Sequence, residues 1–353
     1  MPAPSNPYQP YAEVHKTPNG AGDARPTAKQ ILVDCNAIGK LKNKAVLITG
    51  CSAGLGVETA RALYEAGATL FLTARDIPKL EGIIEDIVAK AEVKGVKPVP
   101  IECHLDSLAS VRQAAELVKT KMKTLHLLIN NAGVMATPYG KTQDGFETQI
   151  GTNHFSHFLL FQLLEPLLIA SVQETGIKSR VISLSSAGHR RFPIDFDILP
   201  PNAPVSEDAY SKWTAYGQSK TANVYMAAAL HQHYASAGIV GLSVHPGGIM
   251  TGLGKHLKPE DYAVFGDWNE VLPILKSPEQ GAATTVFAAV SSFFDDTANG
   301  GVYLADCGVC QAATPEQLKV VGGTGYGPHA YDGDAAERLW QLSYPAVGLK
   351  SNM

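Results

Sequence analysis

The sequence predicts an α/β fold, a single doubly wound domain built on a parallel sheet of about seven strands with helices on both faces. Three observations support this prediction. Short apolar runs alternate with longer segments of helical spacing from about residue 44 to residue 304. The runs lack polar alternation, as expected of strands covered on both faces. A glycine-rich turn follows the first run, at residues 49–56.

The elements follow one another in a regular order. Gly67 ends the first helix as a C-terminal cap, Asp76 and Pro78 open the second, and Asp106 or Ser107 caps the third. Strands are predicted at 44–49, 69–73, 96–103, 125–129, 180–184, 240–245 and 301–304. Helices are predicted at 54–66, 78–94, 107–122, 143–170, 208–237 and 277–290.

We predict that residues 1–42 form an irregular N-terminal arm and that residues 43–353 form the domain, with a C-terminal extension from about residue 305. The arm is rich in Pro, Ala, Asn and Gly and lacks the apolar core of a secretory signal. Residues 158–164 are apolar, but Gln162, Glu165 and Pro166 interrupt the stretch. A buried helix explains it better than a membrane anchor, so no transmembrane segment is expected.

Composition narrows the class of protein. The 353 residues are 45% hydrophobic and 18% charged, with a formal net charge of −4. This balance is typical of a soluble enzyme and argues against nucleic-acid binding, which needs a basic excess. The five cysteines indicate reduced thiols and a cytoplasmic location. Cys307 and Cys310 form a lone CxxC without nearby partners for zinc, so buried thiols and no metal are expected.

The glycine-rich turn Thr49–Gly56 has the pattern of a phosphate site. A parallel strand that feeds a helix leaves backbone N–H groups at the helix N-terminus, where they and the helix dipole favour a phosphate. Gly50 permits the tight turn, Gly54 lets the backbone approach a pyrophosphate, and Gly56 allows close helix–strand packing. The spacing G-x-x-x-G-x-G differs from G-x-G-x-x-G. A plain turn without a ligand is the alternative.

The end of the second strand favours NADP over NAD. An acidic residue about 20 residues after the turn would bind the adenosine ribose hydroxyls. Ala74 occupies that place here, and Arg75 follows with a guanidinium suited to a 2′-phosphate. A solvated surface arginine is the alternative. Asp106 is a candidate partner of the adenine amino group, or else a helix cap.

Tyr216 and Lys220 form the candidate proton-transfer pair. Four residues apart, they lie on one face of a helix. A free phenol ionises near pH 10, and a neighbouring ammonium is expected to lower that pKa. Taken alone, Tyr-x-x-x-Lys is a common surface pair.

Polar residues at other strand ends supply the context for this pair. Ser185 and Ser186 end one strand, and either hydroxyl is placed to hold a substrate carbonyl. Asn130–Gly133 ends the fourth strand, and Asn153 lies in the helix that follows. The turn that starts at His245 contains Pro246 and Gly247 and could wall a nicotinamide. Carboxyl ends of parallel strands share one edge of the sheet, so these groups are expected to meet.

From about Lys44 to Leu304 the chain resembles the short-chain dehydrogenase/reductases, which have a Rossmann-type domain. The resemblance implies Tyr216 as general acid and base, Lys220 as its tuner, Asn153 as anchor of a relay water, and Ser186, with Ser185 as the alternative, as substrate positioner. The implied NADP(H)-binding residues are Gly50, Ser52, Gly54, Leu55, Gly56, Arg75, Asp106, Asn131, Ala132, Gly133, Tyr216, Lys220, Pro246 and Gly247.

The segments 303–307 and 336–343, with Arg75 and Gly39–Leu41, resemble the retinol-dehydrogenase and WW-domain-oxidoreductase-like branch, in particular fungal members, many of which serve secondary metabolism. The resemblance implies a reductase or dehydrogenase for a hydrophobic ketone, aldehyde or alcohol. An epimerase or dehydratase, or a non-catalytic NADP(H) sensor, are the alternatives.

The chain departs from the family in one segment. The spacer from Ser186 to Tyr216 is 30 positions long (216 − 186), which is longer than most members have. We expect the extra residues 189–208 to shape the substrate pocket together with Trp213 and the loop 251–268. We also expect them to obstruct the helix pairing of dimeric members, so a monomer or a homodimer is predicted.

Overall fold

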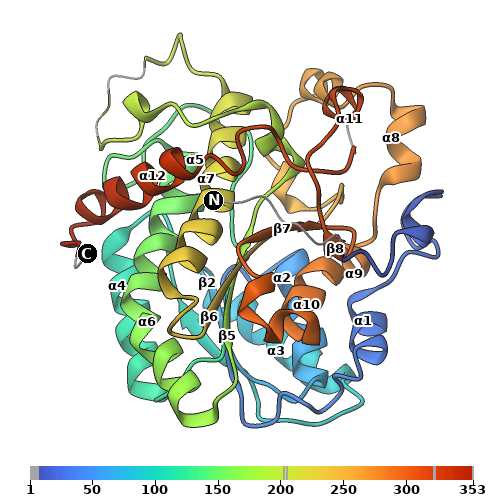
Figure 1. Cartoon of the computed structure of the whole chain (residues 1–353), viewed down its shortest axis with the longest axis vertical. Helices are drawn as coiled ribbons and strands as arrows, with labels where there is room; N and C mark the ends of the chain where they lie inside the picture. Colours follow the sequence, from blue (N-terminus) through green and yellow to red (C-terminus); the bar gives the residue numbers. More distant parts are fainter. Residues whose placement is uncertain (1–7, 202, 204–205, 321–322, 352–353) are drawn as a thin grey trace.

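The computed structural model describes residues 8–201, 203, 206–320 and 323–351, and its centre is one eight-stranded sheet (Figure 1). The strand order is β3-β2-β1-β4-β5-β6-β7-β8. The first seven strands pair in parallel, and the two-residue β8 pairs antiparallel to β7. The predicted parallel sheet is therefore confirmed. The strands are β1 Ala45–Ile48, β2 Thr69–Ala74, β3 Val99–Glu102, β4 Leu127–Asn130, β5 Ser179–Leu184, β6 Ile239–His245, β7 Val302–Ala305 and β8 Gly308–Val309.

Helices cover both faces of the sheet, as predicted. Helices α1, α2, α3 and α10 pack on one face, and α4, α6, α7 and α12 pack on the other (Figure 1). The helices are α1 Ala28–Asp34, α2 Leu55–Glu65, α3 Ile77–Lys90, α4 Leu108–Lys121, α5 Thr148–Ile150, α6 Ser156–Thr175, α7 Lys212–Tyr234, α8 Trp268–Ile274, α9 Pro278–Gly281, α10 Ala283–Val290, α11 Pro315–Lys319 and α12 Gly333–Ala346.

The strand order positions the site. The chain moves outward from β1 through β2 to β3, and then returns to place β4 on the other side of β1. This reversal is a topological switch point at the carboxyl ends of β1 and β4, the place where doubly wound folds bind their ligands. The turns after β1, β4, β5 and β6 all lie at this edge, because these strands are parallel.

The helix predicted from residue 143 begins later. Thr142 N–H donates to the Phe146 carbonyl, Gly145 has a φ of +86°, and the Glu147 carboxylate caps the first turn of α5. A local turn therefore precedes the helix. Thr148–Thr175 is long and apolar enough to cross a membrane by length and composition, but 56% of its most apolar window is buried. Phe158–Phe161 and Leu164 are at most 1% exposed, which confirms the predicted buried helix.

The N-terminal arm is more ordered than expected. The prediction of an irregular segment is wrong for residues 28–34, because Thr27 caps α1 and Ile31 and Leu32 are fully buried. Tyr8 stacks on Phe293 with 4.2 Å between ring centroids. The part of the arm at residues 1–7 lies outside the described residues. The division at residue 43 stays a prediction.

The C-terminal extension completes the core. Trp340 of α12 is 1% exposed and contacts Phe158 and Phe161 of α6 and His233 of α7. The side chains of α12 therefore cover parts of both long helices. The oligomeric state, monomer or homodimer, stays a prediction.

Candidate active site

The glycine-rich turn after β1 is shaped by close contacts. Gly50 has a φ of +74°, and a Cβ there would lie 2.8 Å from the Ala132 Cβ. A Cβ on Gly56 would lie 2.3 Å from the Gly50 carbonyl oxygen, so only glycine lets α2 pack this closely. The N-cap residue is Gly54, which has no side chain to accept a hydrogen bond from the first turn of α2. Ser52 and Leu55 lie half-buried beside it. The first N–H groups of α2 therefore remain available to a pyrophosphate.

The fourth strand supports this turn. Asn131 donates to the carbonyls of Thr49 and Gly50 at 2.7 and 3.2 Å, and Ala132 N–H donates to the Thr49 hydroxyl. These contacts fix the two strand ends against each other. Both side-chain amide atoms of the neighbouring Asn130 are buried without a partner.

The adenosine end carries the two residues that sequence reasoning selected. Arg75 follows β2, is exposed, and makes no hydrogen bond or ion pair among the described residues. Asp106 is not the cap of α4, since Ser107 takes that place at 3.4 Å from Ser110 N. The Asp106 Oδ1 atom is buried and has no partner. A free guanidinium and an unpartnered carboxylate oxygen fit the 2′-phosphate and adenine of NADP(H).

Helix α7 presents the proton-transfer pair. Tyr216 and Lys220 are 7% and 5% exposed, and the Lys220 Nζ atom lies 5.6 Å from the Tyr216 ring centroid. Lys220 donates to the Leu184 carbonyl at 3.1 Å. The Ser186 hydroxyl accepts from Gly188 N–H at 3.1 Å and hydrogen-bonds the Tyr216 hydroxyl. The structure therefore brings Ser186, Tyr216 and Lys220 together.

The pKa values of this pair differ from the prediction. Burial raises the pKa of Tyr216, and the hydrogen bond from Ser186 opposes this rise. Burial also lowers the pKa of Lys220 to about 8. The expectation that Lys220 holds the phenol pKa below its usual value was wrong, because burial of the phenol is the largest effect and the hydrogen bond with Ser186 is what opposes it. The phenol is protonated at neutral pH and is ready to act as an acid.

The hydrogen bonds of Ser185 and Ser186 distinguish these two neighbouring serines. Ser185 is 3% exposed and donates to the Lys220 carbonyl at 2.7 Å, so its hydroxyl is occupied by α7. Ser186 is half-buried and faces Tyr216. Of the two hydroxyls, that of Ser186 is the one that faces Tyr216, and its role as substrate positioner stays a prediction.

Asn153 lies in a π-helical turn, Gly151–Phe155, of the kind that often marks functional sites. Its side-chain oxygen accepts from Val134 N–H at 2.8 Å, and its Nδ2 donates to the Ser219 hydroxyl at 2.9 Å. A Cβ on Gly133 would lie 3.0 Å from the Asn153 Oδ1 and 3.3 Å from the Lys220 Nζ. Asn153 thus connects the cofactor crevice to α7, and its water-anchoring role stays a prediction.

The turn after β6 contains Pro246 and Gly247, which were predicted to wall a nicotinamide. Pro246 is half-buried, and Gly247 has a φ of +107° with its Cα against the side chain of Lys276. His245 accepts from Ala187 N–H at 3.3 Å and ties this turn to the strand end that carries Ser186.

Residues 187–198 and the loop 251–268 lie near α7. Arg190 donates to the carbonyls of Gln317, Val320 and Gly323, so the first part of the insertion is fixed to the C-terminal extension. Trp213 packs edge-on against Phe265 at 5.7 Å, which joins α7 to the loop as expected. Residues 202, 204 and 205 of the insertion lie outside the described part of the chain.

Sequence reasoning missed the contacts of Ser219 and Lys276, and it included Thr251 only as the first residue of the loop 251–268. Ser219 holds Asn153, Thr251 lies where a Cβ on Gly54 would touch it at 3.6 Å, and Lys276 packs on Gly247. Ser219 lies inside the tyrosine–lysine motif, and its spacing from Tyr216 on the same helix could have identified it as a site residue. Lys276, and the contact of Thr251 with Gly54, carried no such signal, because loop contacts have no periodicity. All five cysteines are free, and four are buried, which confirms the predicted thiols.

Comparisons with known proteins agree with this geometry. Residues 44–194 match the family model of short chain dehydrogenase. The chain is 40% identical over 339 residues to the short-chain dehydrogenase/reductase prx1 of Penicillium rubens, covering 96% of this chain and 95% of that protein. It is 33% identical to human retinol dehydrogenase 12, covering 90% of each. A structure from Mycobacterium paratuberculosis, titled a putative uncharacterized protein, superposes with a TM-score of 0.65 at 30% identity, covering 90% of this chain and 98% of that one. The chain therefore belongs to the short-chain dehydrogenase/reductase family, close to fungal prx1 and the retinol dehydrogenases.

Proposed function

We propose that the chain is an NADP(H)-dependent oxidoreductase that interconverts a hydrophobic ketone or aldehyde and its alcohol. The observation that carries the proposal is the convergence of the Ser186 and Tyr216 hydroxyls with the Lys220 ammonium beside Gly133 of the cofactor crevice. The free guanidinium of Arg75 supports NADP(H) over NAD(H). The relation to retinol dehydrogenase 12 and the exposed apolar residues Met250, Leu253 and Val264 support a hydrophobic substrate.

NADP(H), when bound, supplies or accepts the hydride. In the reducing direction the Ser186 hydroxyl donates a hydrogen bond to the carbonyl oxygen and holds it beside Tyr216. Tyr216 transfers its proton to that oxygen as charge develops. Lys220, with its pKa lowered to about 8, stabilises the resulting phenolate and returns a proton to it. In the oxidising direction the same groups act in reverse.

Replacing Tyr216 by Phe tests this function. Loss of the proton donor should lower kcat by about 10²–10⁴-fold while NADPH affinity changes little. The measurement is the loss of NADPH absorbance with a panel of diketones and aldehydes, together with calorimetric titration of NADPH. Net consumption of NADPH also separates a reductase from an epimerase, a dehydratase or a sensor.

Tyr225→Phe is the matched control, since Tyr225 is a buried tyrosine on the same helix that donates to the His329 carbonyl. Its kcat should stay close to that of the unmodified chain. Turnover retained by Tyr216→Phe would contradict the assignment. A cytoplasmic location, favoured by the free thiols, and a role in secondary metabolism remain further proposals.

A further inference from the structure

The turn that walls the proposed nicotinamide site packs on one lysine. Lys276 N–H donates to the Gly248 carbonyl at 2.8 Å, and Ile249 and Lys276 form a parallel β-bridge. A Cβ on Gly247 would lie 2.8 Å from the Lys276 Cδ atom. A displacement of Lys276 would therefore displace the turn at Gly247 and Gly248.

The buried side chain of Lys276 is itself held by the partly exposed carboxylate of Asp306. Its side chain is 4% exposed, and its Nζ atom lies 2.6 Å from the Asp306 Oδ1 at the end of β7. Asp306 has a φ of +53°, and burial raises its pKa, but the charge of Lys276 outweighs this effect and the net pKa is lowered. Removing one partner of a buried pair leaves the other charge uncompensated, so the pair resists separation.

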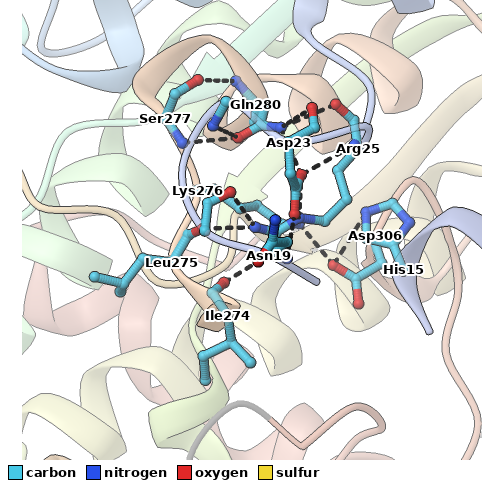
Figure 2. Close-up of polar contacts among 12 residues, drawn as sticks. His15, Asn19, Asp23, Arg25, Ile274, Leu275, Lys276, Ser277, Gln280 and Asp306 are labelled. Carbon is cyan, nitrogen blue, oxygen red and sulfur yellow. Dashed lines mark hydrogen bonds and ion pairs between the residues drawn. The ribbon is translucent and has the colours of Figure 1, made fainter. Parts of the chain in front are cut away.

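The N-terminal arm completes the arrangement (Figure 2). His15 Nε2 lies 3.5 Å from the same Asp306 oxygen. Arg25, 5% exposed, donates to the carbonyls of Ile274 and Leu275 at 2.9 and 2.6 Å, immediately before Lys276. Gln280 donates to the Asp23 and Arg25 carbonyls on the other side of Lys276. Asp23 and Arg25 of the arm therefore hydrogen-bond to the chain on both sides of Lys276, at residues 274–275 and at Gln280.

The arm and the turn face each other directly. His15, Arg25, Gly247, Gly248, Lys276 and Asp306 all line one small cavity of about 90 Å³. No residue of this group was needed for proton transfer, yet the group contains three buried polar side chains, those of His15, Arg25 and Lys276, and the partly exposed carboxylate of Asp306. Buried charges that are fully paired fix one conformation of the chain around them.

We propose that Lys276, Asp306, His15 and Arg25 form a brace that positions the turn 246–248 and thereby the nicotinamide half of the cofactor. The inference rests on the function proposed above. The four residues are positioning residues, because they act through the turn and not on the reacting atoms. Through this brace the N-terminal arm helps to position the cofactor in the active site.

The test compares two ligands on the full chain by calorimetric titration. NADPH reports on both halves of the cofactor site, whereas adenosine 2′,5′-bisphosphate reports on the adenosine half alone. Lys276→Met keeps the stem against Gly247 and removes the ammonium. It should raise the Kd of NADPH about tenfold, lower kcat, and leave the bisphosphate Kd unchanged within about twofold. Lys276→Arg should restore most of the NADPH affinity, and Arg25→Met should show the same selective loss.

Asp295→Asn is the matched control, because it breaks the Arg180–Asp295 pair away from the turn and should weaken neither ligand. If Lys276→Met does not fold, Lys276→Met combined with Asp306→Asn leaves no unpaired charge and is measured instead. Equal loss of both ligands, or no loss of NADPH affinity in Lys276→Met or in Arg25→Met, would overturn the brace. Failure of the unmodified chain to bind NADPH would instead overturn the proposed function, and this inference with it.

Discussion

At the scale of single residues, we expect the choice between NADPH and NADH to depend on one exposed cation, Arg75. Arg75 lies at the end of β2 where Ala74 replaces an acidic residue, and it has no partner among the described residues that would compete with a phosphate. Charge-assisted hydrogen bonds to a phosphate contribute about 1.5–3 kcal/mol each. Arg75 is therefore the residue at which NADPH and NADH should be distinguished.

Replacing Arg75 by Ala should weaken NADPH binding about tenfold or more and change NADH binding little. The measurement is a pair of titrations with the two nucleotides. Lys79→Ala, which removes another exposed cation from the first turn of α3, should affect both nucleotides slightly and equally. Equal weakening of both nucleotides by Arg75→Ala would remove Arg75 from phosphate recognition.

At the scale of elements, the loop 251–268 is held against the start of α7 by two contacts. Asp261 Oδ1 lies 2.5 Å from Lys212 Nζ, and Phe265 packs on Trp213. The loop follows the turn that is proposed to wall the nicotinamide site, so we expect its position to affect how a substrate enters. The contacts do not involve the adenosine half of the crevice.

Replacing Asp261 by Asn should raise the substrate KM about threefold, because the loss of its ion pair with Lys212 loosens the loop only modestly. NADPH affinity should stay unchanged. Steady-state kinetics with a saturating cofactor concentration and a separate NADPH titration give the two values. Asp86→Asn, which breaks an exposed pair with Lys90 in α3, is the control. A parallel loss of NADPH affinity would show that the pair supports the whole site and not substrate entry.

At the scale of the whole molecule, three buried histidines and the half-buried His245 make stability depend on pH. Burial lowers the pKa of His154, His189 and His245 to about 3 and that of His157 to about 4. In the unfolded chain a histidine has a pKa near 6.5. Below that value the unfolded chain binds more protons than the folded chain, so the free energy of unfolding falls as pH falls from about 6.5 to about 4.

Each buried histidine contributes a slope of about 1.4 kcal/mol per pH unit in this window. His154→Gln, which can keep a hydrogen bond to the Ser343 hydroxyl, should flatten the pH dependence by that amount. Denaturant unfolding at several pH values measures the slope. His104→Gln, at a half-buried surface position, should leave it unchanged. An unchanged slope in His154→Gln would show that other groups cause the acid sensitivity.

The sequence predicted the sheet and the strand ends well, because apolar runs without alternation identify buried parallel strands. Polar residues directly after such runs must share one edge, and this places Gly50, Ser186 and Pro246 together. The late start of the helix at Thr148 and the separate roles of Ser185 and Ser186 depend on individual hydrogen bonds. The contacts of Lys276 with Asp306 and the arm join distant segments, and no local pattern encodes them.

The docked arm also affects the order in which the protein is completed. Its hydrogen bonds join Arg25 to Leu275 and Gln9 to Val309, over 250 and 300 positions of the chain. The ribosome synthesises the N-terminus first, so the arm has been synthesised long before its hydrogen-bond partners. A growing chain therefore cannot dock its arm until Leu275 and Val309 have been synthesised.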